Sequence, residues 1–346
     1  MAVAPAPAAA AGPGSSPPAP AWVDQPVTFR AGGMTVDGTY RHPVGAPGPV
    51  PAVLLIAGSG PTDRNGNSTV DPGPVDTLQT LADWLSSDGV ATLRYDKLGS
   101  GETGLGPYAT DPAAIGIAPF EQESLAALRF LAARKGVDVR RLGVVGHSEG
   151  ALFALLLADG RAAGAPPVRA LGLLEPLSVR YLTQLGDQVE AQVSAQLQAR
   201  QISATLAARV DKALTEAVDE LRTRGTVPAD LPYGLANVLS PVTARFLSQA
   251  DRDDPATLGA RLPRRTPVLV TCSDSDSQVS CGEVAHLVGG LAASHARVDF
   301  VRLTGVDHVL KVDPSGSAAD YTKPLAFSPQ LQSALGRFVA QALGAR

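Results

Sequence analysis

The stretch LGVVGHSEGALFALLLA, Leu142 to Ala158, places one serine between two glycines, with an apolar run before it and another after it. The first run is short, rich in valine and bounded by glycine, a pattern typical of a buried strand. The second run is rich in alanine and leucine, which favour helix. A strand that passes into a helix with almost no loop needs glycines where the two elements pack closely, and Gly146 and Gly150 stand there. We therefore expect Ser148 at the apex of a tight turn, with its hydroxyl pointing out of the fold.

The five residues from Gly146 to Gly150 have the form G-x-S-x-G, which is the pattern of a nucleophile elbow. The pattern alone is a weak signal in this chain, because 35 of its 346 residues are glycine. The strand before it and the helix after it are the context that the motif requires. Serine needs a histidine base that is itself oriented by a carboxylate, so partners for Ser148 must be sought downstream.

Strand and helix patterns alternate along most of the chain on both sides of this turn. This alternation predicts an α/β fold with a mostly parallel sheet flanked by helices. Over residues 178–262 it gives way to a long helical pattern rich in Gln, Ala, Glu, Arg and Leu. We expect residues 23–177 and 263–346 to form the core, and 178–262 to be a helical insertion that either caps a substrate pocket or only covers the sheet edge. Residues 1–22, rich in Ala and Pro, are expected to be a disordered tail.

Of the five histidines, His308 is the candidate base. It follows the strand pattern VDFVRL in the loop TGVDH, which would lie at the carboxyl end of the last strand. Sites in open parallel sheets gather at that edge. His42 lies in a Pro/Gly-rich stretch, His147 lies inside the elbow, and His286 and His295 lie in or at the end of a helix.

A carboxylate should lie between Ser148 and His308 if the residues follow the order Ser, Asp or Glu, His. Asp274 and Asp276 both follow the strand pattern PVLVTC. We favour Asp276 as the orienting acid and Asp274 as a loop-stabilising residue. Glu175 remains a rival, because it also follows a strand and would lie at the same edge of the sheet.

Two main-chain N–H groups are needed to bind the oxyanion of an acyl-transfer reaction. The residue after the nucleophile supplies one, here Glu149. The second comes from the loop after the third strand, here AGSGPTDRNGN, and we expect it to be the N–H of Ser59.

Cys272 and Cys281 are the only cysteines and stand nine positions apart. Such a pair, with none elsewhere, predicts a local disulfide, and the alternative is two reduced thiols. The bridge would close a loop around Asp276. No metal site is expected, because the two cysteines and His286 lack a fourth ligand at zinc-finger spacing.

These motifs together resemble the α/β-hydrolase family over about residues 23–346, in the bacterial branch that includes carboxylesterases and serine aminopeptidases. The resemblance is carried by the elbow GHSEG, the strand end LRYDKLGSGET, the acid loop SDSDSQV and the histidine loop GVDH. It implies an eight-stranded sheet, a Ser-His-Asp triad with the acid at Asp276, a helical cap and no cofactor. Many members have His-Gly at the start of the oxyanion loop, where this sequence has Ala57-Gly58.

The expected reaction transfers the acyl group of a small or medium-sized carboxylic ester to water through an acyl-enzyme on Ser148. A serine aminopeptidase or amidase, a lactonase or an acyltransferase could use the same triad. An aminopeptidase would also need an anion for the ammonium group of its substrate, for which Glu149, Glu175 and Asp63 are the candidates. A non-catalytic binding protein with this fold is a further alternative, although such proteins usually lose a triad residue.

The net charge is −4 and no run of Lys or Arg is present, which argues against a nucleic-acid binder. No apolar stretch approaches the roughly 18 residues of a membrane span. The uncharged Ala/Pro-rich start and the close cysteine pair favour a secreted or cell-envelope protein whose signal peptide has been removed, and a cytoplasmic protein is the alternative. The sequence carries no signal for the oligomeric state.

Overall fold

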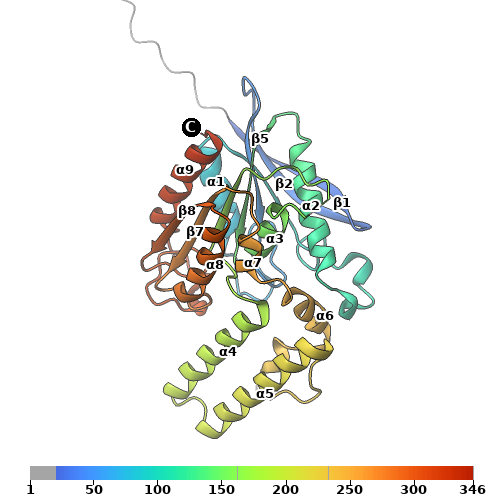
Figure 1. Ribbon diagram of the computed structural model, residues 1–346, viewed down its shortest axis with the longest axis vertical. Helices are drawn as coiled ribbons and strands as arrows, with labels where there is room; N and C mark the ends of the chain where they lie inside the picture. Colours follow the sequence, from blue (N-terminus) through green and yellow to red (C-terminus); the bar gives the residue numbers. More distant parts are fainter. Residues whose placement is uncertain (1–20, 162, 233, 346) are drawn as a thin grey trace, which may run out of the picture.

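The computed structural model describes residues 21–161, 163–232 and 234–345, and in this part of the chain it contains one eight-stranded sheet with helices on both faces (Figure 1). The strands are β1 (Trp22–Ala31), β2 (Met34–Pro43), β3 (Val50–Ile56), β4 (Ala91–Tyr95), β5 (Val137–His147), β6 (Ala170–Leu174), β7 (Pro267–Ser273) and β8 (Arg297–Leu303). The α-helices are α1 (Thr77–Ser87), α2 (Ala118–Ala132), α3 (Gly150–Ala158), α4 (Tyr181–Gln198), α5 (Ala204–Arg224), α6 (Pro241–Ala250), α7 (Pro255–Gly259), α8 (Cys281–Ala293) and α9 (Pro329–Leu343). Short 3₁₀ helices span Gly106–Tyr108, Pro112–Ala114, Leu235–Asn237 and Ala318–Asp320.

The strand order is β1-β2-β4-β3-β5-β6-β7-β8. Strand β2 pairs antiparallel with β1 and with β4, and every pair from β4 to β8 is parallel. The predicted α/β fold class, with a mostly parallel sheet of eight strands, is confirmed. Because the strands from β4 to β8 run in the same direction, the loops that follow them all lie at one edge of the sheet.

Helices cover both faces of the sheet. Residues of α1 and α9 form one apolar layer against it, and α2, α3, α7 and α8 form the other. Strands β4 and β6 are buried along their whole length, since the parallel part of the sheet has helices on both sides. This double cover explains why these strands are continuous apolar runs in the sequence.

The turn between β5 and α3 has the tight geometry expected from the sequence. Ser148 has φ 54°, in the left-handed region that a residue with a side chain rarely adopts. A Cβ added to Gly146 would lie 2.2 Å from the carbonyl oxygen of Gly150. A Cβ added to Gly150 would lie 2.3 Å from the carbonyl oxygen of Ile56 in β3. Both glycines are therefore required for the helix to pack this closely on the strands.

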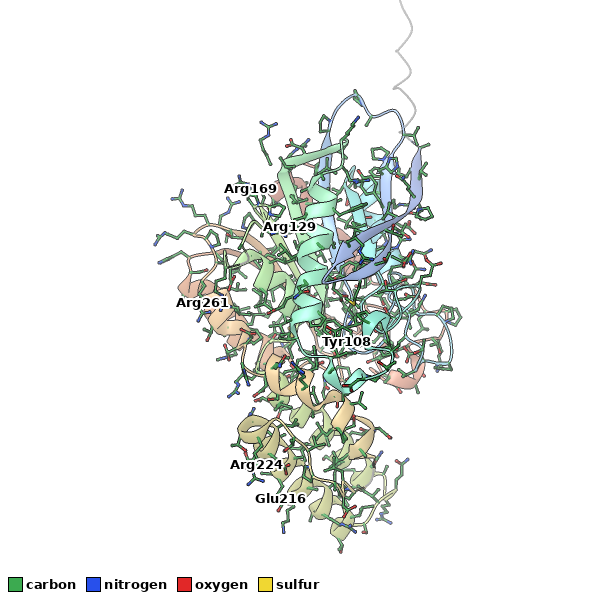
Figure 2. The ribbon with its side chains drawn as sticks, turned by 90° about the vertical axis from the view of Figure 1, so that its right-hand side faces the viewer. Tyr108, Arg129, Arg169, Glu216, Arg224 and Arg261 are labelled. Carbon is green, nitrogen blue, oxygen red and sulfur yellow. A yellow bond between two sulfur atoms is a disulfide. The ribbon has the colours of Figure 1, made fainter. Side chains whose placement is uncertain are left out.

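Between β6 and β7 the chain leaves the sheet and forms α4, α5 and α6, which lie at one end of the molecule (Figure 1). These helices share an apolar cluster of their own, to which Leu214 and Leu221 of α5 belong. Glu216 and Arg224 lie on α5 far from the sheet, and both are exposed (Figure 2). The insertion is therefore a small helical unit with its own core.

Two boundaries differ from the expected segments. Strand β1 begins at Trp22, the last residue of the expected tail 1–22, because its main chain pairs with β2 from that position onward. Residues 1–20 of that tail lie outside the described residues. At the end of the expected insertion, Leu258 and Leu262 pack into the apolar core on the sheet instead of joining α4 to α6.

A search of the described helices for membrane spans finds none that is both long enough and apolar enough to cross a bilayer.

Substitution of Gly150 by alanine should destabilise the protein strongly. The added methyl group would overlap the Ile56 carbonyl oxygen, and β3 cannot move without breaking its pairs with β4 and β5. We expect the free energy of unfolding to fall by roughly 3 kcal/mol or more, as measured by urea denaturation. Gly186→Ala in α4 is the matched control, because its added Cβ has no neighbour within 4 Å. It should be neutral or stabilise the helix by up to about 1 kcal/mol, and equal losses in the two variants would contradict the packing argument.

Candidate active site

Ser148 lies between β5 and α3, half-buried at the wall of a cavity of about 510 Å³. Its N–H donates to the Leu174 carbonyl at the end of β6 (3.0 Å), and its carbonyl accepts from the N–H of Leu177 (3.1 Å). These bonds hold the strained backbone of the turn from both sides. The hydroxyl group has no hydrogen-bond partner within the described residues.

His308 and Asp276 form a hydrogen-bonded pair from the loops after β8 and β7. The distance between His308 Nδ1 and Asp276 Oδ2 is 2.8 Å, and the Asp276 side chain is fully buried. The other oxygen of Asp276 accepts from the N–H groups of Gln278 (2.7 Å) and Val279 (3.1 Å). Burial would by itself raise the pKa of Asp276, but His308 and these two N–H groups outweigh it and lower the pKa. Because an ionised carboxylate only accepts, Nδ1 of His308 carries the proton and Nε2 is left free to act as a base.

His147 connects the histidine loop to the elbow. Its Nε2 donates to the main-chain carbonyl of His308 (2.8 Å), and the centres of the two imidazole rings lie 5.0 Å apart. Burial, together with the neighbouring His308, lowers the pKa of His147 to about 3, so this ring is neutral at neutral pH. The contact ties the main chain of His308 to the residue directly before Ser148, although the structure contains no hydrogen bond between the Ser148 hydroxyl and the His308 ring. Sequence reasoning missed this role of His147.

Of the three carboxylates considered for the acid, Asp276 is the one that the structure places on His308. Asp274 accepts from the N–H of Gly305 (2.7 Å) and so joins the loops after β7 and β8. Glu175 is completely buried, and neither of its carboxyl oxygens has a hydrogen-bond partner within the described residues. Burial, and next the charge of Asp276, raise the pKa of Glu175 well above its usual range, so it is a neutral acid beside Asp276.

The N–H groups of Ser59 and Glu149, which were expected to bind an oxyanion, both belong to residues of the cavity wall. Neither N–H donates to another protein group in the described part of the chain. Gly58 brings the loop after β3 against the elbow, since a Cβ added to it would lie 3.2 Å from Ser148 Cβ. Two unpaired main-chain donors therefore belong to the same cavity wall as Ser148.

A buried network of side chains joins these two donor segments. Lys97, after β4, is 2% exposed, and its ammonium group donates to the carbonyl of Gly58 and to Oε1 of Glu149 (3.1 Å). Tyr181, the first residue of α4, donates its hydroxyl to the other carboxylate oxygen of Glu149 (2.6 Å). Sequence reasoning did not identify this network. The only signal was that Lys97 belongs to the strand-end motif, where a lysine in a glycine-rich loop is usually exposed.

The cavity beside Ser148 is formed jointly by the sheet side of the molecule and the insertion. Its apolar wall includes Phe120 of α2, Leu185 of α4 and Phe246 of α6. Lys97 and Glu149 are its charged groups, and they neutralise each other. In the described residues, no cluster of three or more His, Cys, Asp or Glu side chains is arranged to hold a metal ion.

Solved structures of several hydrolases superpose on most of this chain. The dienelactone hydrolase-like promiscuous phosphotriesterase P91 from metagenomic libraries has a TM-score of 0.54 and 16% identity, covering 94% of this chain and 100% of its own. Esterase Pf2001 of Pyrococcus furiosus has a TM-score of 0.55 and 14% identity, and the match covers 93% of this chain and 92% of its own. Est1E of Butyrivibrio proteoclasticus, solved with ferulic acid bound, has a TM-score of 0.55 and 16% identity, and the match covers 92% of this chain and 99% of its own. The protein therefore has the α/β-hydrolase fold.

A curated protein is similar to this chain in sequence as well. Esterase EstD of Thermotoga maritima is 29% identical over 270 residues, which is 75% of this chain and 55% of EstD. The matched region therefore spans only about half of the length of that relative. No protein-family model matches the chain.

The predicted bridge between Cys272 and Cys281 is present in the structure, with the two Cα atoms 5.3 Å apart. It joins β7 to the first residue of α8 and closes the loop that carries Asp276.

Replacing both cysteines by alanine should lower the free energy of unfolding by about 2–3 kcal/mol, because the unfolded chain is no longer cross-linked. The measurement compares urea unfolding of the oxidised protein and the double variant. Unchanged stability would show that the bridge does not support the fold.

Glu123 of α2 is a buried carboxyl group near the site whose protonation state in the folded protein can be tested. It is fully buried, with Oε2 accepting from the N–H of Leu98 (2.9 Å), and burial raises its pKa to about 8. In the unfolded chain its pKa is about 4.3. Between these values the folded state holds a proton that the unfolded state has lost, so the free energy of unfolding falls as pH rises, by up to about 1.4 kcal/mol per pH unit.

Glu123→Gln cannot ionise and should lack this component of the pH dependence. In urea unfolding at pH 5, 7 and 9 and constant ionic strength, we expect the variant to gain stability relative to the wild type as pH rises to about 8. Parallel stability curves for the two proteins would mean that Glu123 is ionised in the folded state.

Proposed function

We propose that the protein is a carboxylesterase-type serine hydrolase that cleaves esters with small or medium-sized acyl groups. Ser148 is the nucleophile, His308 the base and Asp276 the orienting carboxylate. The observation that carries the proposal is the 2.8 Å bond between His308 and Asp276, anchored through His147 beside an elbow that holds Ser148 at φ 54°. The esterase names of the relative from Thermotoga maritima and of Pf2001 support the same reaction class.

The reaction proceeds in two acyl transfers. Nε2 of His308 takes the proton of the Ser148 hydroxyl while Oγ bonds to the ester carbonyl carbon, and the carbonyl oxygen becomes an oxyanion. The N–H groups of Ser59 and Glu149 bind that oxyanion. When the intermediate collapses, the C–O bond to the alcohol breaks and His308 returns the proton to the leaving alcohol. Water then attacks the acyl-enzyme by the same steps and releases the acid and free Ser148.

The serine and histidine must come within hydrogen-bond distance when substrate binds. In enzymes without substrate such bonds are often long or poorly aligned, and they tighten in the complex. The proposed reaction therefore requires Nε2 of His308 to reach the Ser148 hydroxyl in the complex with substrate, while Nδ1 stays bonded to Asp276.

An ester is a better substrate for this cavity than a peptide with a free amino group. Both carboxylate oxygens of Glu149 are already bound, one by Lys97 and one by Tyr181. Glu175 is buried and neutral, and Asp63 accepts from two N–H groups of its own loop. Asp63 also does not line the cavity, so none of the three anions considered for an aminopeptidase offers a free carboxylate to an ammonium group there. Lactonase and acyltransferase activities on the same triad remain secondary alternatives, and a non-catalytic binding protein is a minor one.

We propose further that the helical insertion is a cap over the substrate. Leu185 of α4 and both Val242 and Phe246 of α6 line the cavity, so the insertion supplies one of its apolar walls. The ligand class that fits is a small ester with an apolar acyl or alcohol part.

A secreted or cell-envelope location is proposed on the basis of the Cys272–Cys281 bridge. Disulfides persist in oxidising compartments and are rare in the cytosol. Fractionation of cells that express the natural gene, followed by immunoblotting, would test this location.

The first test is labelling of Ser148 by a fluorophosphonate probe, mapped by peptide mass spectrometry. We expect labelling in the wild type, none in Ser148→Ala, and hydrolysis of p-nitrophenyl butyrate that far exceeds hydrolysis of leucine p-nitroanilide. A folded wild-type protein that neither labels nor hydrolyses the ester would favour the binding-protein alternative.

The role of the acid is tested by a matched pair of carboxyl-to-amide variants. Asp276→Asn should lower kcat by about 10⁴-fold, because His308 loses the acceptor that fixes its tautomer. Glu175→Gln should change kcat by less than about tenfold, because Glu175 is already neutral and does not contact His308. The reverse order of effects would make Glu175 the acid.

A further inference from the structure

We propose that Lys97 is a positioning residue for the oxyanion-binding N–H of Ser59, acting through the carbonyl of Gly58. This inference rests on the proposed esterase function, and it assigns a role to a buried charge that the reaction scheme does not use. It also predicts that the two oxyanion donors are mechanically linked.

The geometry of one peptide unit carries the proposal. The carbonyl of Gly58 and the N–H of Ser59 belong to the same planar trans peptide, so they point in opposite directions and turn together. The Lys97 ammonium group, which is 2% exposed, donates to that carbonyl. Fixing the carbonyl oxygen therefore fixes the direction of the Ser59 N–H, and Ser59 and Ser148 line the same cavity.

The bond also strengthens the donor. A hydrogen bond from a charged ammonium group to a carbonyl draws electron density away from the peptide, which makes its N–H a better donor. Such an effect is largest in a site with little water, and Lys97 is 2% exposed.

Glu149 makes the buried charge of Lys97 tolerable and connects it to the second donor. Its carboxylate lies 3.1 Å from the Lys97 ammonium group, and Glu149 itself is 4% exposed. A buried charge without such a partner would be strongly unfavourable. The main-chain N–H of Glu149 is the other oxyanion donor, so one ion pair ties the donor segment after β3 to the donor segment at the start of α3.

Asp96 forms hydrogen bonds to the loop after β3 at a second point. Asp96, directly before Lys97, accepts from the main-chain N–H of Arg64 (2.8 Å) and from its guanidinium group (3.0 Å at Nε). The strand end after β4 thus holds the loop at Gly58 and at Arg64, on either side of the glycine- and proline-containing turn. A loop held at both ends keeps its N–H aimed without help from substrate, which is the condition for oxyanion stabilisation.

The test compares Lys97→Met with the wild type in kcat, KM and the inhibition constant of a trifluoromethyl ketone, which forms an oxyanion adduct with an activated serine. Loss of a whole oxyanion donor costs about 10²–10³ in kcat, so a misaimed donor should cost about 10- to 100-fold. We expect that loss in kcat, an equal rise in the inhibition constant, and a KM within about threefold of the wild type. A purely structural role would not make the first two changes equal.

Two further variants keep the test decisive. Lys97→Met leaves Glu149 as an unpaired buried charge and can unfold the protein. In that case the same measurements are made on the double variant Lys97→Met with Glu149→Gln, which removes both charges. Arg141→Met is the matched control, because Arg141 also donates to a main-chain carbonyl, that of Pro49 (2.9 Å), but at the opposite end of β5. It should leave kcat and the inhibition constant unchanged.

The results separate failure of this inference from failure of the proposed function. A wild-type protein with no ester hydrolysis and no fluorophosphonate labelling of Ser148 would remove the function and the inference together. An active wild type, with wild-type kcat and inhibition constant in the folded double variant, would overturn the role of Lys97 alone. If the double variant Lys97→Met with Glu149→Gln shows the same fall in kcat and rise in inhibition constant as Lys97→Met, the role of Lys97 is supported.

Discussion

The close contact between α3 and the strands beside it is the constraint on which the rest of the site depends. Gly150 lies so near the Ile56 carbonyl that no side chain fits between them, and Gly146 lies equally near Gly150. The backbone between them must therefore turn within two residues, and Ser148 takes the strain at φ 54°. The same contact places the start of α3, with its unpaired N–H at Glu149, next to the loop after β3. The Ser148 hydroxyl and two unpaired main-chain N–H groups are thus brought to one place by a single packing interaction.

The parallel sheet supplies the second level of organisation. Strands β3 to β8 end at one edge, so loops far apart in the sequence meet there. Asp276 and His308 are bonded across 32 residues, and His147 reaches the His308 carbonyl across 161. Asp276 and His308 lie in the loops after β7 and β8, and His147 is the last residue of β5, so all three meet at this edge of the sheet.

The buried ionisable groups near the site follow two different rules. Lys97 and Glu149 are paired and lie between the two donor segments, whereas Glu123 and Glu175 have no cation of their own and are held as neutral acids by burial. The site therefore combines one charged pair with uncharged neighbours, so that the ionised Asp276 faces His308 without a second negative charge beside it.

Local patterns in the sequence were enough to predict the fold class, the tight turn at Ser148 and the disulfide between the two cysteines. Each of these depends on residues that are near one another in the chain, where strand and helix periodicity, glycine and spacing act directly. Tertiary structure decided which carboxylate contacts His308, since Asp274, Asp276 and Glu175 all follow strands that end at the same edge. It also decided the roles of His147 and Lys97, because their partners lie 161, 52 and 39 positions away. No periodicity encodes contacts at such separations, and they exist only once the sheet has brought its loops together.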